Sequence, residues 1–299
     1  MTIHGLGVLG PEPWPTGCRM VRLWDCGVTW KHLHLGPGRF DFTPLDELLK
    51  AARAGGTTSL LYVLGATPQW AAADPTLPGF APWLGPGSNS APATMALWDE
   101  YVTTMVQRYA HRIRAWQVWN EPQLRWFWGY GTYEQLAEMT RRAYRIIKAH
   151  DAGLRVVSAP VLPRPGSGGM TRGRKYLEAL AAKGWPIDVH AAHLYPEPGF
   201  GALRWSALAR TWRRGLVDVN APRRPRWVTE TNYNLGAGRL PAPLQGSLVQ
   251  ATDLAATRQG IARVLWYTAG RHSNPDLLGI PFTPGSPGLA ALTPLMEAP

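Results

Sequence analysis

The sequence is poor in cysteine and in long apolar runs. Its 299 residues include two cysteines, Cys18 and Cys26, which are too few for a disulfide framework and match no zinc-ligand spacing. The longest apolar runs, such as residues 60–64, are far shorter than the roughly 18 residues of a membrane span. These shortages exclude a disulfide scaffold, a zinc ribbon and a membrane-spanning chain, and we expect both cysteines to be buried thiols.

Charged residues are also few, at 17% of the chain, whereas hydrophobic residues make up 45%. This balance supplies a large core and argues against a disordered chain. The first residues lack the basic start, apolar stretch and cleavage site of a secretory signal. We therefore expect a globular protein that is cytoplasmic, is phage-borne, leaves the cell by another route, or has already been trimmed.

The charge that is present is unequal. There are 31 Lys and Arg against 20 Asp and Glu, which gives a net charge of +11. Most of the basic residues are Arg, and they are dispersed along the chain rather than gathered in runs. A dispersed excess is typical of a solvated surface. An acidic polysaccharide is an alternative reason for it, and nucleic acid is the less favoured partner.

Short β-prone runs alternate with longer amphipathic patterns along the chain. Residues 4–8, 20–28, 58–66, 113–121, 155–161, 188–195, 226–232 and 263–269 are the β-prone runs. The helical patterns cover residues 44–54, 95–111, 132–150, 173–183, 202–219 and 246–259. One helical pattern lies between each pair of neighbouring runs from the second run onward, which predicts parallel strands joined by crossover helices.

Eight strands and six strong helices in a chain of this length predict the α/β class and a single (β/α)8 TIM barrel. We expect residues 1–299 to form one catalytic domain of this kind. Only eleven residues, rich in Pro and Gly, separate the first two strands, so this crossover is predicted to lack a regular helix. A doubly wound sheet is the alternative, but no glycine-rich phosphate loop opens a helix after an early strand.

Two carboxylates lie where a barrel places its active site, at the carboxyl ends of the strands. Glu121 ends the fourth strand, and Glu230 lies near the end of the seventh. Apolar stretches precede both, and a buried carboxylate without a partner is costly. The alternative is that each carboxylate pairs with an arginine at the rim. Two carboxyl groups that face each other are what retaining glycoside hydrolysis requires, since one attacks the anomeric carbon and the other protonates the departing oxygen.

The segment Trp119-Asn120-Glu121-Pro122 on the fourth strand, with Glu230 on the seventh, resembles glycoside hydrolase clan A. The likeness extends over nearly the whole chain. The stretch GRFDFTPLDELLKAARAGG, the later TPQW, and NEP with its following aromatic cluster are most similar to family thirty-nine and related bacterial exopolysaccharide glycosidases. The resemblance implies a retaining glycosidase that acts on an oligo- or polysaccharide, such as a bacterial cell-wall or capsular glycan.

The resemblance also implies roles for single residues. Glu121 is the general acid/base, Glu230 is the nucleophile, and Asn120 hydrogen-bonds the 2-hydroxyl of the sugar. Strict alternation would point Asn120 and Glu121 to opposite faces, so the strand must twist or kink there. Pro122 disfavours the helical region for Glu121 and is expected to hold it extended.

Supporting residues follow from strand phase and from the same resemblance. His193 and Tyr195 are two residues apart on the sixth strand and share a face. The resemblance makes Tyr195 a hydrogen-bond donor to Glu230, and Arg22 the cation that neutralises the surroundings of the nucleophile. It makes Trp266 the floor beneath the bound sugar. The structural alternatives are a core tyrosine, a surface ion pair and a core tryptophan, respectively.

The two carboxyl groups need divergent pKa values for these roles. We expect the pKa of Glu230 to be lowered by Arg22 and by neighbouring donors, and the pKa of Glu121 to be raised by an apolar setting and the nearby negative charge.

Loop aromatics and histidines around the pair are further candidates. Each aromatic is either a sugar platform or packing between loop and helix, and the histidines are candidate contacts for sugar hydroxyls or an acidic group. The aromatics are Trp30, Trp70, Trp126, Phe127 and Trp128, and the histidines are His32 and His34.

No metal-spaced set of Cys and His, HExxH motif or GxSxG elbow occurs in the sequence, so we expect no cofactor and no metal. His190 lies three residues before His193 and faces the other way, which argues against a metal pair. Two other functions remain open at this point: a noncatalytic carbohydrate-binding barrel and, less favoured, a basic nucleic-acid-binding protein.

Overall fold

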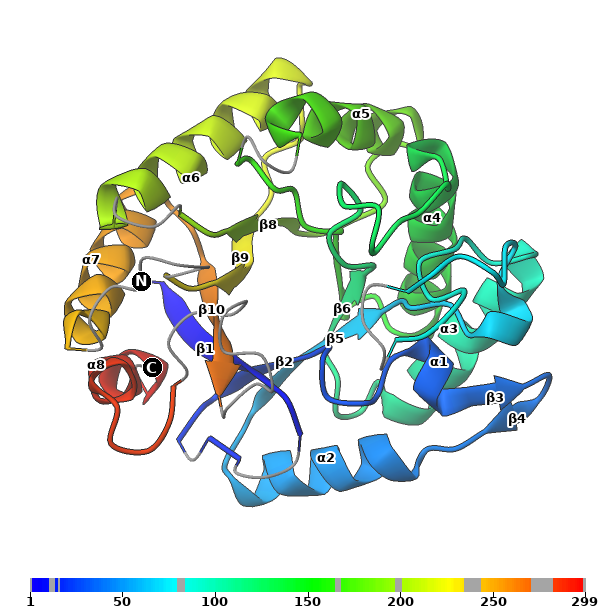
Figure 1. Cartoon of the computed structure of the whole chain (residues 1–299), viewed down its shortest axis with the longest axis horizontal. Coiled ribbons are helices and arrows are strands. Elements are labelled where there is room, and N and C mark those ends of the chain that lie inside the picture. Colours follow the sequence, from blue (N-terminus) through cyan, green and yellow to red (C-terminus); the bar gives the residue numbers. More distant parts are fainter. Residues whose placement is uncertain are drawn as a thin grey trace.

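The computed structural model describes residues 2–10, 14–15, 17–79, 84–164, 168–196, 201–233, 243–269 and 282–297. Eight parallel strands are paired in the order β7-β6-β5-β2-β1-β10-β9-β8. Parallel bridges from Val157 to Val189 and from Val161 to Ala192 join the two outer strands of this order. The sheet therefore forms a nearly closed ring surrounded by helices, which confirms the predicted (β/α)8 TIM barrel (Figure 1).

The barrel strands begin within two residues of the predicted runs, but several end earlier. In chain order they are β1 (Ile3–Val8), β2 (Met20–Leu23), β5 (Ser59–Leu64), β6 (Ala115–Val118), β7 (Arg155–Val157), β8 (His190–Leu194), β9 (Arg226–Thr231) and β10 (Arg263–Ala269). The last residues of the predicted runs at 20–28, 113–121 and 155–161 thus lie beyond the strands. Their backbone is free to turn, and several polar side chains of the site come from these positions.

Six helices occupy the predicted intervals. They are α2 (Thr43–Ala54), α3 (Met95–Tyr109), α4 (Tyr133–His150), α5 (Gly169–Ala182), α6 (Gly201–Asp218) and α7 (Leu244–Arg258). The described residues between β1 and β2 contain no helix, as predicted.

Other elements were not predicted from the sequence. The helix α8 (Pro287–Glu297) packs on α7 and on β1. After β2 come the short helix α1 (Trp30–Leu33), a hairpin of β3 (His34–Gly36) and β4 (Arg39–Phe40), and, further on, the 3-10 turn η1 (Gln69–Ala71).

Local signals set the ends of the helices. At the start of α4 the Thr132 hydroxyl accepts a hydrogen bond from the Gln135 backbone, and the Gln135 side chain accepts one from the Thr132 backbone. This capping box satisfies two backbone donors that the helix leaves unpaired. The helix α2 has Pro44 in its first turn, where a missing N–H costs nothing, and ends at Gly55.

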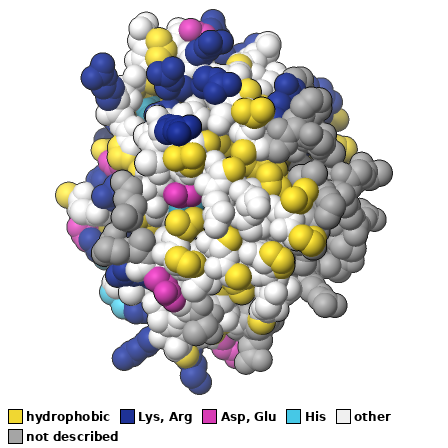
Figure 2. All heavy atoms as spheres, turned by 90° about the vertical axis from the view of Figure 1, so that its left-hand side faces the viewer, with side chains coloured by type: hydrophobic (Ala, Val, Ile, Leu, Met, Phe, Trp, Pro, Cys, Tyr) yellow, Lys and Arg dark blue, Asp and Glu magenta, His cyan; other side chains and the backbone are white. Residues whose placement is uncertain are grey.

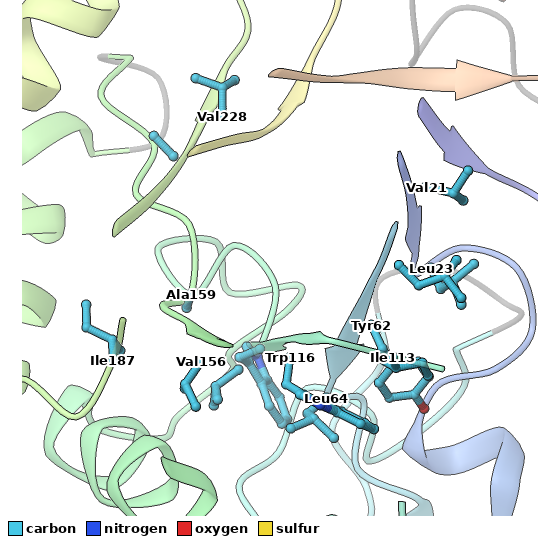
Figure 3. Close-up of a cluster of buried hydrophobic side chains, with 14 of the residues drawn as sticks. Val21, Leu23, Tyr62, Leu64, Ile113, Trp116, Val156, Ala159, Ile187 and Val228 are labelled. Atoms are coloured by element: carbon cyan, nitrogen blue, oxygen red, sulfur yellow. The ribbon is translucent and has the colours of Figure 1, made fainter. Parts of the chain in front are cut away.

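Alternate strand residues pack into two separate cores. Outward-facing side chains such as Val21, Tyr62, Trp116 and Val228 contact the helices (Figure 3). A second cluster draws side chains from seven strands, which can meet only inside the barrel. Its members are Met20, Leu61, Ala115, Val157, Val189, Ala191, Trp227 and Leu265. This cluster fills the interior near the starts of the strands, and we call it the lower layer.

The excess of basic residues lies on the outside of the molecule. Figure 2 shows Lys and Arg side chains gathered at the upper edge of one side, where the C-terminal half of α6 lies in Figure 1. That half carries the exposed Arg210, Arg213 and Arg214. Among the described helices, none combines the length and the apolar character that crossing a bilayer requires.

Candidate active site

A kink after β6 presents Asn120 and Glu121 to the mouth of the barrel. The strand ends at Val118, and the φ angles of Trp119 and Glu121 are 70° and 38°. Positive φ is rare for residues other than glycine, so the backbone here departs sharply from a strand. This turn of the backbone is the predicted kink, which lets the adjacent residues Asn120 and Glu121 both face the mouth. The expectation that Pro122 holds Glu121 extended is wrong, because the φ of Glu121 is positive.

The carboxylate of Glu230, at the end of β9, is held from two sides. The guanidinium of Arg22 on β2 donates to Glu230 Oε1. The hydroxyl of Tyr195, just after β8, donates to Glu230 Oε2 at 2.8 Å. The resemblance implied both contacts, and Arg22 is buried rather than part of a surface ion pair.

Arg22 is the centre of a hydrogen-bond network that joins three strands. Besides Glu230, its Nη2 donates to Asn120 Oδ1 at 2.8 Å and its Nε donates to Gln117 Oε1 at 3.0 Å. The amide of Gln117 in turn donates to the Thr229 hydroxyl at 3.1 Å. Gln117 is fully buried on β6, and a fixed partner on each side locks the orientation of the guanidinium.

His193 on β8 lies between the two carboxyl groups. Its Nδ1 is 2.7 Å from Glu121 Oε1 and 3.4 Å from Glu230 Oε2. A carboxylate oxygen of each glutamate and a ring nitrogen of His193 all lie within 4.8 Å of one another. Carboxyl groups about 5 Å apart are typical of retaining glycosidases, whereas inverting enzymes separate them further.

Burial shifts the pKa values of all three groups. It raises the pKa of Glu121 to about 7, against the opposing charges of Arg164 and Arg22. It lowers the pKa of His193 to about 3, so the imidazole is neutral at neutral pH. Burial also raises the pKa of Glu230, and the charge of Glu121 adds to this, although Arg22 opposes it. The direction expected for Glu121 is confirmed, and the lowering expected for Glu230 is wrong because burial outweighs the cation.

Trp266 does not lie in this site. Its indole N–H donates to His4 at 3.1 Å, and its ring packs against Tyr233 and Phe282 in the core between barrel and helices. The prediction that Trp266 forms the floor beneath a sugar is therefore wrong. The interior position of β10 belongs to the next residue, Tyr267, because Leu265 of the lower layer fixes the phase of the strand.

Two further candidates, His34 and Trp128, are buried and offer almost no surface to a ligand. His34 has no exposed surface, stacks on Phe40 with ring centres 3.9 Å apart, and accepts a hydrogen bond from Trp30. It cannot contact a sugar hydroxyl in this structure. Trp128 is 3% exposed and packs edge-on against Trp119, so it supports the kink that carries Glu121 rather than offering an open platform.

Other loop aromatics are open to solvent. Trp70, in η1, is 36% exposed, and its indole N–H donates to the His34 carbonyl at 2.9 Å. Trp126 and Tyr130, in the loop after Glu121, are 57% and 74% exposed. They line a cavity of about 160 Å³ together with Leu77, Pro78, Asn89, Arg125 and Gly129.

Three polar residues of the mouth were not predicted from the sequence: Gln117, Asp25 and Tyr267. The Tyr267 hydroxyl donates to Asp25 Oδ2, and the charge of Arg22 acts on the Asp25 carboxyl. Asp25 lies two residues beyond β2, so the rule that selected Glu121 and Glu230 would also have found it. Gln117 and Tyr267 each lie two residues after an inward-facing residue, Ala115 and Leu265. Each is surrounded by apolar residues in the sequence, so its polar group did not stand out.

Glu121, His193 and Glu230 are also the one group of described residues close enough together to hold a metal ion. The guanidinium of Arg22 lies against Glu230, and its positive charge opposes a cation there. The donor set therefore fits a pair of reacting acids better than a metal centre.

Comparison with solved structures finds this fold in several glycosidases. The GH39 enzyme from Xanthomonas axonopodis pv. citri has a TM-score of 0.69 and 20% identity, over 98% of this chain and 68% of that chain. A monomeric β-xylosidase from Caulobacter crescentus CB15 also gives 0.69 and 20%, over 92% of this chain and 61% of that one. The endo-β-1,4-mannanase from Thermotoga petrophila gives 0.65 and 14%, over 99% and 76%.

These likenesses establish the fold, which resembles that of clan A and of family thirty-nine within it. The chain spans 68% of the length of the Xanthomonas enzyme and 61% of that of the Caulobacter xylosidase. No family model and no curated protein sequence matches it.

Proposed function

We propose that the protein is a retaining glycoside hydrolase, with residues 1–299 as its single catalytic domain. It cleaves a glycosidic bond in an oligo- or polysaccharide, such as a bacterial cell-wall or capsular glycan, by double displacement. The observation that carries this proposal is the pair of buried carboxyl groups, Glu121 and Glu230, with oxygens within 4.8 Å of each other at the mouth of the barrel. One sugar ring spans such a distance.

In the first half-reaction Glu230 attacks the anomeric carbon, and the bond to the departing oxygen breaks as Glu121 gives that oxygen its proton. Glu121 can supply the proton because burial raises its pKa to about 7. Glu230 must be ionised to attack, and the hydrogen bonds from Arg22 and Tyr195 stabilise its charged form against the cost of burial.

In the second half-reaction a water molecule replaces the leaving group. The ester linkage removes the negative charge of Glu230, so Glu121 ionises more readily and takes a proton from the water. The water oxygen attacks the anomeric carbon, and the ester bond to Glu230 breaks. His193 Nδ1 can donate to Glu121 when this carboxyl is ionised and accept from it when it is protonated.

Asn120 has a defined orientation for contact with the sugar. Its Oδ1 accepts from Arg22, which leaves both N–H donors of the amide for a ligand. A hydrogen bond from this amide to the 2-hydroxyl would strengthen as charge develops in the transition state. Further along the glycan, the exposed rings of Trp126 and Tyr130 offer flat apolar faces to neighbouring sugars.

Azide rescue of two alanine variants tests the proposal. Glu230→Ala lacks the nucleophile, so azide attacks from its side and gives a glycosyl azide of inverted configuration. Glu121→Ala can still form the glycosyl-enzyme from a substrate with a good leaving group, so azide then gives the retained configuration.

Nuclear magnetic resonance distinguishes the two azides, and also shows which anomer the wild-type enzyme forms first. An inverted first product from the wild type would contradict the double displacement. A protein that binds glycans but turns over none of them would be a noncatalytic binding barrel. The exposed Glu47→Ala is the control that should change neither product nor rate.

A further inference from the structure

A third carboxyl group belongs to the same cluster but has no part in the double displacement. Asp25 follows β2, three residues after Arg22. Its charge acts on Glu230, and the charges of Arg22 and Glu121 act on it, so the three acids of the mouth are close neighbours. The hydroxyl of Tyr267 on β10 donates to Asp25 Oδ2 and fixes the carboxyl in place.

The charge of Asp25 is costly in this position. Burial, with a smaller contribution from the charge of Glu121, raises its pKa to about 6 against the hydrogen bond from Tyr267 and the charge of Arg22. An asparagine would accept the same hydrogen bond from Tyr267 without placing another negative charge beside Glu230. Packing alone therefore does not explain an aspartate here. Costly charges are typical of sites where a ligand uses them.

The carboxyl of Asp25 also has capacity for a ligand. A carboxylate offers about four acceptor positions, and Tyr267 occupies one of them. No described residue donates a hydrogen bond to Oδ1, and Asp25 keeps part of its surface exposed. A carboxyl that is crowded by protein and still reached by solvent is accessible to a sugar ring bound at the catalytic pair.

We propose that Asp25 accepts hydrogen bonds from hydroxyl groups of the sugar ring bound at Glu121 and Glu230, and so selects a neutral ring over one that carries a carboxylate. The proposal rests on the proposed function. Hydroxyl groups are the donors that a neutral sugar presents on its ring, and each can give its proton to a carboxylate. A uronic acid would instead bring a further negative charge against Asp25 and Glu230, whose cation Arg22 is already engaged, and like charges at a largely buried site repel strongly.

Kinetics on 4-nitrophenyl β-D-xyloside, glucoside, mannoside and glucuronide test the selection. We expect the wild type to cleave at least one neutral glycoside and to be least efficient on the glucuronide. Asp25→Asn keeps an acceptor for Tyr267 and removes the charge. It should lower kcat/KM for the best neutral glycoside roughly 10- to 100-fold, the range for a hydrogen bond to a charged group. Relative activity on the glucuronide should rise.

Asp46→Asn is the matched control. Asp46 also accepts hydrogen bonds from a tyrosine, Tyr109 at 2.7 Å, and from an arginine, Arg108, but on the outer surface of α2 and α3. This substitution should leave the preference among the four glycosides unchanged. Thermal unfolding of both variants checks that each is folded at the assay temperature.

Monodeoxy analogues of the best glycoside identify the hydroxyl group. If Asp25 contacts one hydroxyl, removing that hydroxyl costs much less in Asp25→Asn than in the wild type, because the contact is already lost. Additive losses at every hydroxyl would overturn the proposal. So would a wild type that cleaves the glucuronide best.

Binding separates failure of this inference from failure of the proposed function. Glu230→Gln and the double variant with Asp25→Asn are titrated calorimetrically with xylotetraose, mannotetraose, cellotetraose and trigalacturonate. Weaker binding of a neutral tetraose by the double variant supports the inference even if the wild type shows no turnover. If turnover depends on Glu230 but Asp25→Asn changes neither glycan binding nor the preference among the glycosides, the inference is rejected and the proposed function stands. If the protein shows neither binding nor turnover, both the inference and the proposed function are rejected.

Discussion

The interior of the barrel has two layers of opposite character on the same strands. The lower layer is apolar, and the next inward-facing residue on most of these strands is polar. On β2, Met20 is followed two residues later by Arg22; on β6, Ala115 is followed by Gln117; on β10, Leu265 is followed by Tyr267. The same relation holds for Ala191 and His193 on β8, and for Trp227 and Thr229 on β9.

This difference separates stability from activity along each strand. The lower layer stabilises the fold through apolar burial and contributes no group to the reaction. The polar residues that follow it on the strands, which we call the upper layer, bury charges and amides, and these cost free energy unless every partner is in place. A step of two residues therefore decides whether a substitution should affect mainly folding or mainly turnover.

The largest effect is expected in the upper layer, from Arg22→Met. Without the guanidinium, Glu230 loses its closest positive charge, its pKa rises further, and a smaller fraction of the nucleophile is ionised at a given pH. We expect kcat/KM to fall about 10³-fold or more, with the remaining activity shifted to higher pH. Kinetics between pH 5 and 9 measure this. Arg114→Met breaks an exposed ion pair with Asp151 and should retain the wild-type profile.

The lower layer should respond in the opposite way to Leu265→Ala. Leu265 is fully buried, so the substitution leaves a cavity and should lower the free energy of unfolding by about 2–5 kcal/mol. Turnover at a temperature where the variant is folded should change little. Chemical denaturation measures the first effect, and Leu254→Ala, at a position 50% exposed on α7, is the control. A strong loss of kcat without a loss of stability would contradict the division between the layers.

The pH dependence of stability should report the burial of Glu121. Because the folded-state pKa is raised from 4.5 to about 7, the native protein binds a proton more tightly than the unfolded chain in that range. Stability is therefore lost as the pH rises from about 4.5 to about 7.

Glu121→Gln removes this loss. We expect it to be more stable than the wild type by about 1–3 kcal/mol at pH 8, with the difference shrinking toward pH 4. Denaturation curves at both pH values measure it. Glu47→Gln, which removes an exposed carboxyl outside the barrel, is the control. An equal difference at both pH values would mean that Glu121 does not titrate in this range.

The smallest effect is expected outside both layers, from Trp126→Ala. Its ring is 57% exposed beside the cavity after Glu121, so it can contact a sugar remote from the reacting bond. We expect KM for a polymeric substrate to rise about five-fold, while KM for a short aryl glycoside stays the same. Leu203→Ala, at an 85% exposed position on α6, is the control. Equal changes on both substrates would place the aromatic ring in the reacting subsite instead.

The fold was predictable because its signals are repeated along the chain. Strand runs and amphipathic helices recur in alternation, and each pair supports the same architecture. The helix α8 was missed because Pro294 lies inside it and its apolar residues show little periodicity. The ends of β6 and β7 were placed too late, since hydrophobicity does not record where the backbone begins to turn.

The site was predictable only in part. Glu121 and Glu230 stood out because polar side chains follow apolar strands. Arg22 was identified through the resemblance alone, and Tyr195 through its shared face with His193 together with the resemblance. Trp266 was misplaced because the resemblance called for an aromatic ring on β10 and the strand carries two in succession. Leu265 faces the interior, so Tyr267, two residues later, also faces inward and Trp266 does not. The direction of Leu265 is known only once the strands are paired.

The pairing of β1 with β10 has a consequence for the order of assembly. Ile3 pairs with Arg263, so β1 leaves the ribosome long before the strand that pairs with it on one side is made. Until then β1 lacks a neighbour on one side, and Asp25 lacks the tyrosine that holds it. Translation thus completes the candidate sugar site only when β10 has been made, and a nascent chain that already contains both glutamates does not yet hold Asp25 in place.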